Sequence, residues 1–518
     1  MSKHAATRRE TEMPEPDPRY EIIVTGEATG LVPVGGGKER PITVIGTEAI
    51  RRTFGDRTIQ QALNMRSSPG VTEVVLNPDA HVGYGAPIGC VAVSPTHIYP
   101  GPVGVDIKCS MSLLALDLPE EAVADKKTRR ALIEAISHRT PTGPGQGQRQ
   151  AKKGRRISRE LGVRAVTQGA SAKVLGELGV PLEWAARCED AFHVGHDNTR
   201  EALEARLDRI LAMGELRLAQ NFEAKANQLG TYGGGNHFGE CEIVRLRETE
   251  EAKRAASAFG LVDGQVAFLS HCGSRGIGAM LADLQFKTLQ RKFARWNIPL
   301  PGNDKELVYA PLGSQEADDY IDDMSLGANF ATVNHMLINA LVLEAFREVI
   351  PGTTGRLVYF ISHNIARLES TNMQGSSQAW VHRKGATRAF PAGHPGLRGT
   401  LFESVGHPIL LPGNPQAGSS VMVARPGASL SCYSVNHGAG RRLSRTAASK
   451  TLDQKLIDQS FADRDILTNT RNYPIDEAPD AYKDFEEVMR SVELAGLAGE
   501  VARLNARFVI KDGDKADD

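Results

Sequence analysis

Residues 103–109 read Val-Gly-Val-Asp-Ile-Lys-Cys and close a part of the chain made of short apolar runs broken by glycine turns. The stretch sets a carboxylate, Asp106, and a thiol, Cys109, three positions apart. Such positions face opposite sides of a regular strand but converge at a bend or bulge. A hard oxygen ligand beside a soft sulfur ligand favours a metal ion that accepts both. Taken alone, the pattern is more typical of a cysteine buried as a small apolar residue.

Four later segments each place a histidine among glycine, asparagine or serine. They are residues 235–238 (GNHF), 270–276 (SHCGSRG), 362–364 (SHN) and 436–441 (NHGAGR). A lone histidine in such a loop is usually structural, but loops carry a large share of binding and catalytic residues. One Asp, one Cys and several His from distant segments predict a metal-centred active site rather than a structural zinc site.

Composition narrows the class of protein. The 518 residues hold 61 Lys and Arg against 62 Asp and Glu, a net charge of −1, so any nucleic-acid contact must come from a local patch. The six cysteines form no Cys-x-x-Cys pair, which argues against a zinc finger and a disulfide framework. No apolar run approaches the roughly 18 residues of a membrane span, and no secretory signal opens the chain. We therefore predict a cytoplasmic protein with no membrane partner.

The order of patterns predicts one large α+β domain over residues 19–511, with mixed sheets around a central metal and nucleotide cleft. Residues 1–18 are polar and expected to be disordered, and residues 512–518 form an acidic tail. We expect strands at 20–25, 42–45, 71–76, 90–93, 103–107 and 507–511. Helices are expected at 126–137, 170–178, 198–220, 328–350 and 482–506, with a helical, partly flexible insertion at about 119–228. The basic stretch 141–156 predicts either a solvated linker or an RNA contact.

Taken together, the motifs resemble the RtcB family of RNA ligases from about residue 20 to residue 511. They occur in the order found in that family. They are residues 79–89 (DAHVGYGAPIG), the 106–109 segment, 233–240 (GGGNHFGE), 270–278 (SHCGSRGIG), 362–366 (SHNIA), 382–393 (HRKGATRAFPAG), 437–445 (HGAGRRLSR) and 509–511 (VIK). Any one of these motifs is weak evidence for the family, whereas the whole series in this order is specific for it.

The resemblance implies a GTP-dependent ligase with two Mn²⁺ ions. Cys109 would bridge the ions, His237 and His271 would complete one site, and Asp106 and His363 the other. A thiolate bridge is chemically sensible because the two cations keep it deprotonated. The donor types alone suit zinc equally well, so manganese comes from the resemblance.

The resemblance also implies the chemistry. His437 would attack the α-phosphorus of GTP to form His–GMP, and an RNA 3′-phosphate, made where necessary from a 2′,3′-cyclic phosphate, would take up the GMP. A 5′-hydroxyl end would then displace it, in tRNA splicing or RNA repair. The resemblance also allows an archease-like activator as a partner. The GTP- or GMP-binding residues would be Asn236, Glu240, Asn364, Pro412, Ser419, Gly438, Ala439, Gly440 and Lys511. The RNA ends would be held by Arg275, Arg383, Lys384 and Arg441, with Arg388, Arg442 and Arg445 close by in sequence.

Three departures from the family pattern stand out. Residues 412–419 read PGNPQAGS, where the family usually has Pro-Gly-Ser-Met-Gly-Thr, and Pro415 removes a backbone donor. Ser110-Met111-Ser112 follows Cys109 without the family's arginine, and His335 replaces another arginine. The altered loop keeps open a metal-dependent phosphoesterase that opens cyclic phosphates without ligation. A non-catalytic RNA-binding paralogue is the other alternative, although no predicted metal ligand is missing.

Overall fold

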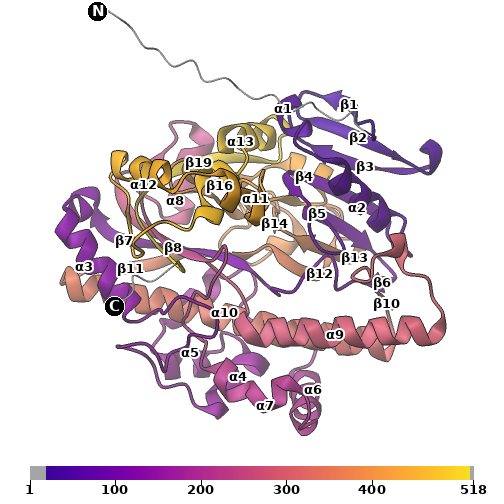
Figure 1. Cartoon of the computed structure of the whole chain (residues 1–518), viewed down its shortest axis with the longest axis horizontal. Coiled ribbons are helices and arrows are strands. Elements are labelled where there is room, and N and C mark those ends of the chain that lie inside the picture. Colours follow the sequence, from indigo (N-terminus) through magenta and orange to yellow (C-terminus); the bar gives the residue numbers. More distant parts are fainter. Residues whose placement is uncertain (1–18, 514–518) are drawn as a thin grey trace, which may run out of the picture.

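Two large β-sheets form the centre of the computed structural model, which describes residues 19–513 (Figure 1). The predicted tail 1–18 and residues 514–518 of the predicted acidic tail 512–518 lie outside the described residues. The first sheet has seven strands in the order β1-β2-β3-β4-β5-β13-β12. Their bounds are β1 Ile23–Gly26, β2 Thr29–Val34, β3 Glu39–Ile45, β4 Glu73–His81, β5 Ile88–Ser94, β13 Gln378–Lys384 and β12 Asn364–Ser370. All neighbours are antiparallel except β3 and β4.

The second sheet has the order β11-β7-β9-β8-β19-β16-β15, and the short strand β18 pairs with β19. Its strands are β11 Gly355–Ser362, β7 Ser110–Pro119, β9 Gln265–Cys272, β8 Phe238–Leu246, β19 Ala498–Lys511, β16 Gly418–Ala424, β15 Pro408–Asn414 and β18 Leu467–Thr468. Two small ribbons, β6 His97–Ile98 with β10 Ala310–Pro311 and β14 Ala386–Arg388 with β17 Ser434–Asn436, complete the strands.

The two sheets share one apolar core, because strands of both bury side chains against each other. Val75 and Val91 of the first sheet lie in the same buried cluster as Leu113 and Leu269 of the second. Each of these strands is buried on both faces, so its apolar residues form a near-continuous run. The outer face of the first sheet is covered by α1 (Glu48–Arg51) and α2 (Asp56–Arg66). Helices cover the outer face of the second sheet.

The longest of those helices is α10 (Gln315–Val349), which crosses the lower half of Figure 1 beside α9 (Arg275–Trp296). It begins where the Ser314 hydroxyl accepts a hydrogen bond from the Ala317 backbone N–H, an N-cap. By length and apolar composition α10 resembles a membrane span, but its most apolar window is wholly buried inside the protein. Its hydropathy is therefore that of a core helix.

The predicted helical insertion lies between β7 and β8. It contains α3 (Lys126–Ser137), α4 (Arg159–Gln168), α5 (Ala172–Leu178), α6 (Arg200–Ala212) and α7 (Arg217–Ala226). Its apolar faces join α10 and the second sheet in one core. The basic loop 141–156 is packed rather than a free linker, because the buried Gln148 side chain donates to the backbone carbonyls of Arg139 and Gly230. The remaining helices are α8 (Glu250–Phe259), α11 (Arg445–Thr451), α12 (Gln454–Asp463) and α13 (Phe485–Leu494).

The α+β prediction is confirmed, but several predicted elements differ in extent. Residues 103–107 form turns rather than a strand, and 198–220 divides into α6 and α7. The helix predicted at 328–350 starts earlier, at Gln315. The helix predicted at 482–506 is wrong: α13 ends at Leu494, and Gly496, with φ 70°, turns the chain into β19.

Candidate metal and nucleotide site

Five predicted metal ligands meet at one edge of the second sheet. Asp106 and Cys109 precede β7, His237 precedes β8, His271 is the penultimate residue of β9, and His363 follows β11. Because these neighbouring strands are antiparallel, the start of β7 pairs with the end of β9 and the end of β11, and β8 begins opposite His271. The strand ends therefore coincide in space although the residues are far apart in sequence.

A tight turn brings the first two ligands together. The Cys109 backbone N–H donates to the Asp106 carbonyl over 3.1 Å. Between them Lys108 adopts a left-handed conformation with φ 53°. Its side chain is fully buried and donates to the Asp190 carbonyl and the Thr332 hydroxyl, which holds the turn in place. The bend, not a strand, therefore places carboxylate and thiol at one point.

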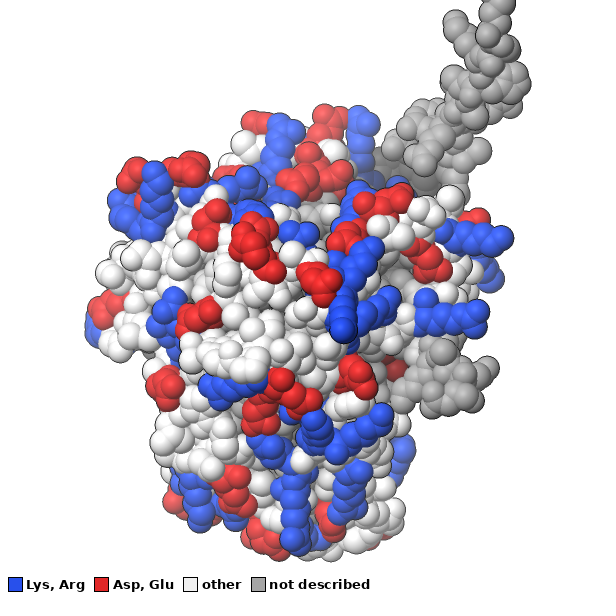
Figure 2. Space-filling view, turned by 90° about the vertical axis from the view of Figure 1, so that its left-hand side faces the viewer, with Lys and Arg blue, Asp and Glu red and all other residues white. Residues whose placement is uncertain are grey.

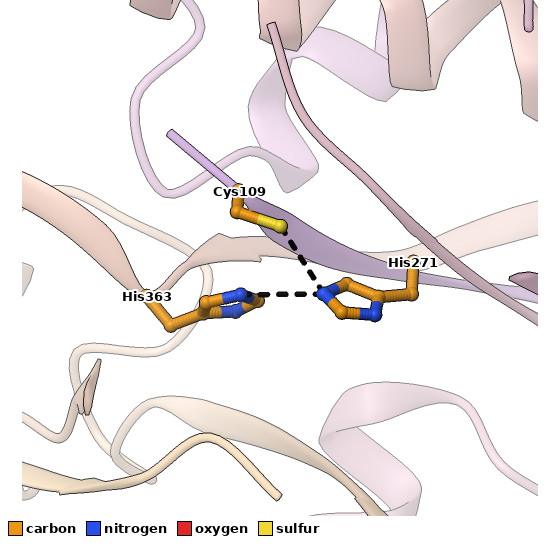
Figure 3. Close-up of side chains that lie close together, drawn as sticks. All are labelled: Cys109, His271 and His363. Atoms are coloured by element: carbon orange, nitrogen blue, oxygen red, sulfur yellow. Dashed lines mark hydrogen bonds between the residues drawn. The ribbon is translucent and has the colours of Figure 1, made fainter. Parts of the chain in front are cut away.

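The ligand atoms form two groups that share the Cys109 thiol. Asp106, Cys109 and His237 make one group, and Cys109, His271 and His363 make the other, each with its donor atoms within 4.8 Å of one another. In the second group the Nε2 atom of His271 lies 3.2 Å from Sγ of Cys109 and 3.3 Å from Nε2 of His363 (Figure 3). Cys109 belongs to both groups, as the implied bridge requires, whereas His237 and His271, which the resemblance assigns to one metal, fall into different groups. His237 instead lies 2.8 Å from the Asp106 carboxylate.

The histidines are oriented for metal binding. Nδ1 of His237 faces the Tyr232 carbonyl, and Nδ1 of His271 faces the Asn236 carbonyl. A carbonyl only accepts, so each Nδ1 carries the hydrogen and each Nε2 faces Cys109, which in His271 leaves the lone pair on Nε2. Nε2 of His237 also faces the Asp106 carboxylate. Burial opposes ionisation of His237, but Cys272, Cys109 and Asp106 outweigh it and raise its pKa well above the ordinary value, so a bound cation would replace that proton. Burial also lowers the pKa of His271 and His363 well below the ordinary value, which favours the neutral ligand form. Burial, and then the Asp106 charge, raises the pKa of the Cys109 thiol, so a bound cation is what would ionise it. These donors fit a pair of divalent cations.

His437 stands beside this centre, directly after β17. Its ring centroid lies 4.7 Å from that of His363. Its Nδ1 is 2.6 Å from Oδ2 of Asp79 and 2.9 Å from the Gly385 carbonyl. Both partners accept, so Nδ1 is the protonated nitrogen and Nε2 carries the lone pair. The arrangement leaves a nucleophilic nitrogen on a ring whose other nitrogen is fixed.

A cavity of about 340 Å³ opens over His437 and four of the five candidate metal ligands, Asp106, Cys109, His271 and His363. All nine predicted nucleotide-binding residues line it: Asn236, Glu240, Asn364, Pro412, Ser419, Gly438, Ala439, Gly440 and Lys511. Gly440 has φ 73°, and a Cβ there would lie 2.3 Å from the Asp79 carbonyl oxygen, so glycine is required for this approach. One cavity therefore joins the candidate nucleophile, metal ligands and nucleotide contacts.

Charged side chains form a buried group in the wall of the same cavity. Nζ of Lys511 lies 3.2 Å from Glu477, and Arg441 lies 3.1 Å from the same carboxylate. Burial opposes ionisation of Glu477, but Lys511, Arg445 and Arg441 outweigh it and lower its pKa to about 2. Lys511 is thus a buried, paired lysine rather than an exposed one at the end of the chain.

Comparison with known proteins agrees with this geometry. The family model described as tRNA-splicing ligase RtcB matches residues 61–512. The chain belongs to the RtcB family. It is 34% identical to the tRNA-splicing ligase RtcB of Aeropyrum pernix over 89% of this chain and 93% of that protein. It is 33% identical to the Nanoarchaeum equitans protein of the same name, over 93% and 97%, and to the RNA-splicing ligase RtcB of Mycobacterium tuberculosis, over 86% and 98%.

The residues predicted to hold RNA ends divide into two groups in this RtcB-family chain. Lys384 and Arg441 line the cavity, as does Arg445. Arg383 does not: its guanidinium is 1% exposed and forms a two-point ion pair with Glu369, so it is unavailable to a phosphate. Arg388 shares that buried network. Arg275 also lies outside the cavity lining, with Nε bonded to the Thr231 hydroxyl. Arg383 is thus held in an internal ion pair, whereas an RNA contact by the half-buried Arg275 stays a prediction.

The basic loop 141–156 has its charges largely paired. Arg149 contacts Glu223, Lys153 contacts Glu348 and Arg155 contacts Glu344. Figure 2 likewise shows basic and acidic side chains interspersed over one face of the molecule. These pairs favour a structural role for the loop over an RNA contact.

Two site residues carry roles that the sequence did not reveal. Asp79 lies in a quoted motif, but its bond to His437 joins residues 358 positions apart. Lys483 is 3% exposed, and its Nζ donates to the Pro78 and Ala80 carbonyls on either side of Asp79. Its backbone N–H donates to the Gly440 carbonyl. For Asp79 and Lys483, the sequence indicated only that each side chain is charged, and not which residue it contacts.

Two of the three family departures meet in space. The Ser112 hydroxyl lies 2.9 Å from Nδ1 of His335, whose Nε2 faces the Cys272 carbonyl at 3.0 Å. Burial lowers the pKa of His335 to about 4, so the pair is uncharged. The third departure, Asn414, accepts hydrogen bonds from the backbone N–H groups of Gln416 and Ala417, which closes the altered loop. Pro415 itself lines the cavity.

Proposed function

We propose that this chain is a GTP-dependent RNA ligase that joins a 2′,3′-cyclic phosphate or 3′-phosphate end to a 5′-hydroxyl end. The observation that carries the proposal is the His437 ring, fixed at Nδ1 by Asp79 and placed in one cavity with metal ligands. The RtcB relatives, named as splicing ligases, support RNA as the substrate. No observation favours a phosphoesterase without ligation or a non-catalytic paralogue.

His437 is the nucleophile in the first step. Its Nε2 lone pair attacks the α-phosphorus of GTP, a P–N bond forms, and the P–O bond to pyrophosphate breaks. An RNA 3′-phosphate oxygen then attacks the same phosphorus and frees His437, which gives an RNA end capped by GMP through a pyrophosphate. The 5′-hydroxyl of the second RNA attacks the 3′-phosphate and GMP leaves. A cyclic phosphate is first hydrolysed to the 3′-phosphate.

Two Mn²⁺ ions would be held by the groups that share Cys109, with Asp106 and His237 on one side and His271 and His363 on the other. When bound, divalent cations supply charge stabilisation for phosphoryl oxygens. The protein orients this centre through the carbonyls behind His237 and His271, and Asp79 keeps the His437 proton on Nδ1. Thiolate and imidazole are also zinc ligands, so manganese itself rests on the family resemblance.

Guanine would be recognised at the wall of the same cavity. A carboxylate accepts hydrogen bonds from the N1–H and the N2 amino group of guanine, and adenine lacks that pair of donors. Glu240 is 2% exposed, and its Oε1 has no hydrogen-bond partner among the described residues. Lys511 and Asn236 lie along the same wall. Lys384 and Arg441 remain as contacts for the RNA phosphates, while an archease-like activator and a cytoplasmic location stay predictions.

The first experiment is labelling with α-³²P-GTP and Mn²⁺ on a denaturing gel. The wild type should acquire an acid-labile label, and His437→Ala should acquire none. His138→Ala is the matched control, since His138 caps α3 outside the cavity, and it should label like the wild type. Absence of label on metal-loaded wild type, with an activator added, would refute the ligase proposal. Joining of RNAs with 3′-phosphate and 5′-hydroxyl ends then tests the later steps.

A further inference from the structure

A second glutamate lies behind the proposed guanine contact. Glu240 and Glu242 are two positions apart on β8, so both side chains point to the same face of the strand. Glu242 is 0% exposed. Oε1 of Glu240 and both carboxyl oxygens of Glu242 have no hydrogen-bond partner among the described residues. Three buried carboxyl oxygens without partners need a physical account, because an ionised carboxylate in such a place is costly.

The surroundings hold too little positive charge for two carboxylates. Lys511, on the neighbouring strand β19, is the cation that acts on Glu240, and its Nζ is already 3.2 Å from Glu477. Tyr473 lies near Glu240 on the cavity wall. Ser419, on β16, is the polar group beside Glu242, and among the described residues no lysine or arginine forms an ion pair with Glu242. Two buried carboxylates two positions apart on one face of a strand are not expected to be ionised together without compensating charge.

We infer that Glu242 is a neutral carboxylic acid that donates its proton toward Glu240 and so prepares Glu240 as the acceptor for guanine. The inference rests on the proposed function. It adds a positioning residue to the nucleotide site, one that touches neither guanine nor phosphate. Glu242 lies deeper than Glu240, since Glu240 lines the cavity and Glu242 does not. The pair then carries at most one negative charge, and that charge sits on the residue that faces the ligand.

The pKa shifts of the two glutamates agree with a neutral Glu242 behind a Glu240 that can ionise. Burial raises the pKa of Glu240 to about 8, while Lys511 opposes that rise. Burial raises the pKa of Glu242 well above its ordinary value, the charge on Glu240 raises it further, and the Ser419 hydroxyl opposes. Guanine N–H donors bond to the charged form of Glu240 and lower its pKa. Binding of GTP near pH 7 should therefore release about one proton, all of it from Glu240.

Calorimetry in two buffers of different ionisation enthalpy measures that proton. The full chain carries His437→Ala to prevent turnover and is loaded with Mn²⁺ beforehand, so that protons released by metal binding are excluded. GTP is compared with ATP, which has the same triphosphate. We expect about one proton released with GTP and far less with ATP. Glu242→Gln should behave like its parent, because the amide N–H replaces the acid proton, whereas Glu240→Gln should release none.

A second pair of measurements separates positioning from folding. Glu242→Met keeps the volume but has no donor, and it should raise the GTP dissociation constant about tenfold at an unchanged melting temperature. Infrared difference spectra between wild type and Glu242→Gln are recorded above about pH 9, where Glu240, with its pKa of about 8, is ionised. They should show a protonated carboxyl band in the wild type that is missing in Glu242→Gln. If that band persists in Glu242→Gln, or if Glu242→Gln loses as much GTP affinity as Glu242→Met, Glu242 is not the proton carrier and the inference is wrong.

The infrared arm needs no nucleotide, so it reports on Glu242 even if GTP is not the substrate. If His437 acquires no label but the Glu242 carboxyl band is present, the proposed function is refuted and the inference about Glu242 stands. If labelling is normal but the band is absent, the proposed function stands and the inference about Glu242 is refuted.

Discussion

Nδ1 of His437 lies 2.6 Å from Oδ2 of Asp79, and the same carboxylate oxygen lies 3.2 Å from the His437 backbone nitrogen. One fully buried carboxylate therefore fixes both the ring and the backbone of the candidate nucleophile. The fixed tautomer places the lone pair on Nε2, where the proposed attack on phosphorus needs it. In that mechanism Asp79 would decide whether His437 is reactive, although it need not touch the nucleotide.

Replacing Asp79 with asparagine should change the tautomer of His437 while the position of its ring stays the same. The amide has nearly the same shape, but its NH₂ group can face Nδ1 and favour the wrong tautomer of His437. We expect the rate of His–GMP formation to fall by about 10²–10⁴-fold, by analogy with other carboxylate–histidine pairs. Rapid-quench labelling with α-³²P-GTP measures it. Mn²⁺ content should not change, because Asp79 belongs to neither ligand group. A normal labelling rate would show that Asp79 is only structural.

Lys483 supports the same carboxylate from behind, since its Nζ donates to the carbonyls on both sides of Asp79 over 2.9 and 2.8 Å. Lys483→Met leaves both carbonyls without a donor and should lower the unfolding free energy by about 2–4 kcal/mol. In the folded variant, kcat for guanylylation should fall while KM for GTP stays near the wild-type value. Urea unfolding and initial rates measure the two effects. Lys253→Met, on the exposed side of α8, is the control and should change neither. A raised KM with normal kcat would contradict a positioning role.

The candidate ligands and the α+β class could be predicted from residue types and motif order, because glycine, histidine and cysteine motifs can be recognised in the sequence without knowledge of the packing. The grouping of the ligands did not follow. Whether His271 shares a metal with His237 or with His363 depends on the antiparallel register of β7, β8, β9 and β11, which local sequence does not encode. The same limit applies to Asp79 and His437, whose contact is made by tertiary structure alone.

The errors have similar causes. Residues 482–506 are rich in helix-forming side chains, yet their second half becomes β19 because it lies between β8 and β16 in the sheet. The motif predicts Arg383 as a phosphate contact. Its burial against Glu369 and Ser434 depends on tertiary packing, which a strand pattern alone does not show.

Because Cys109 belongs to both ligand groups, we predict that its replacement affects both metal ions, whereas replacement of any other ligand affects one. Cys109→Ala removes a ligand from both groups and should weaken binding of both Mn²⁺ ions by at least about tenfold. His363→Ala should weaken one ion, and Asp106→Ala the other, so each should lower the bound metal from about two to about one per chain at a limiting Mn²⁺ concentration. Equilibrium dialysis with elemental analysis measures the stoichiometry. Cys188→Ala, a half-buried cysteine outside both groups, should bind like the wild type. Equal losses in all three site variants would argue against two separate ions.

Glu477 predicts how acid destabilises the site. Its pKa is lowered to about 2 in the folded protein, against an ordinary value of 4.5, because Lys511, Arg445 and Arg441 outweigh the effect of burial. A depressed carboxyl pKa stabilises the fold above pH 4.5, and that contribution is lost as the pH falls from about 4.5 toward 2; it amounts to about 3 kcal/mol at most. Glu477→Gln should therefore be less stable than the wild type at pH 7, and the difference should shrink steadily below pH 4.5. Chemical unfolding from pH 7 to pH 3 measures it, with the exposed Glu134→Gln as the control. A gap between wild type and Glu477→Gln that stays constant down to pH 3 would mean that the Glu477 charge does not stabilise the fold, and that its role is confined to packing.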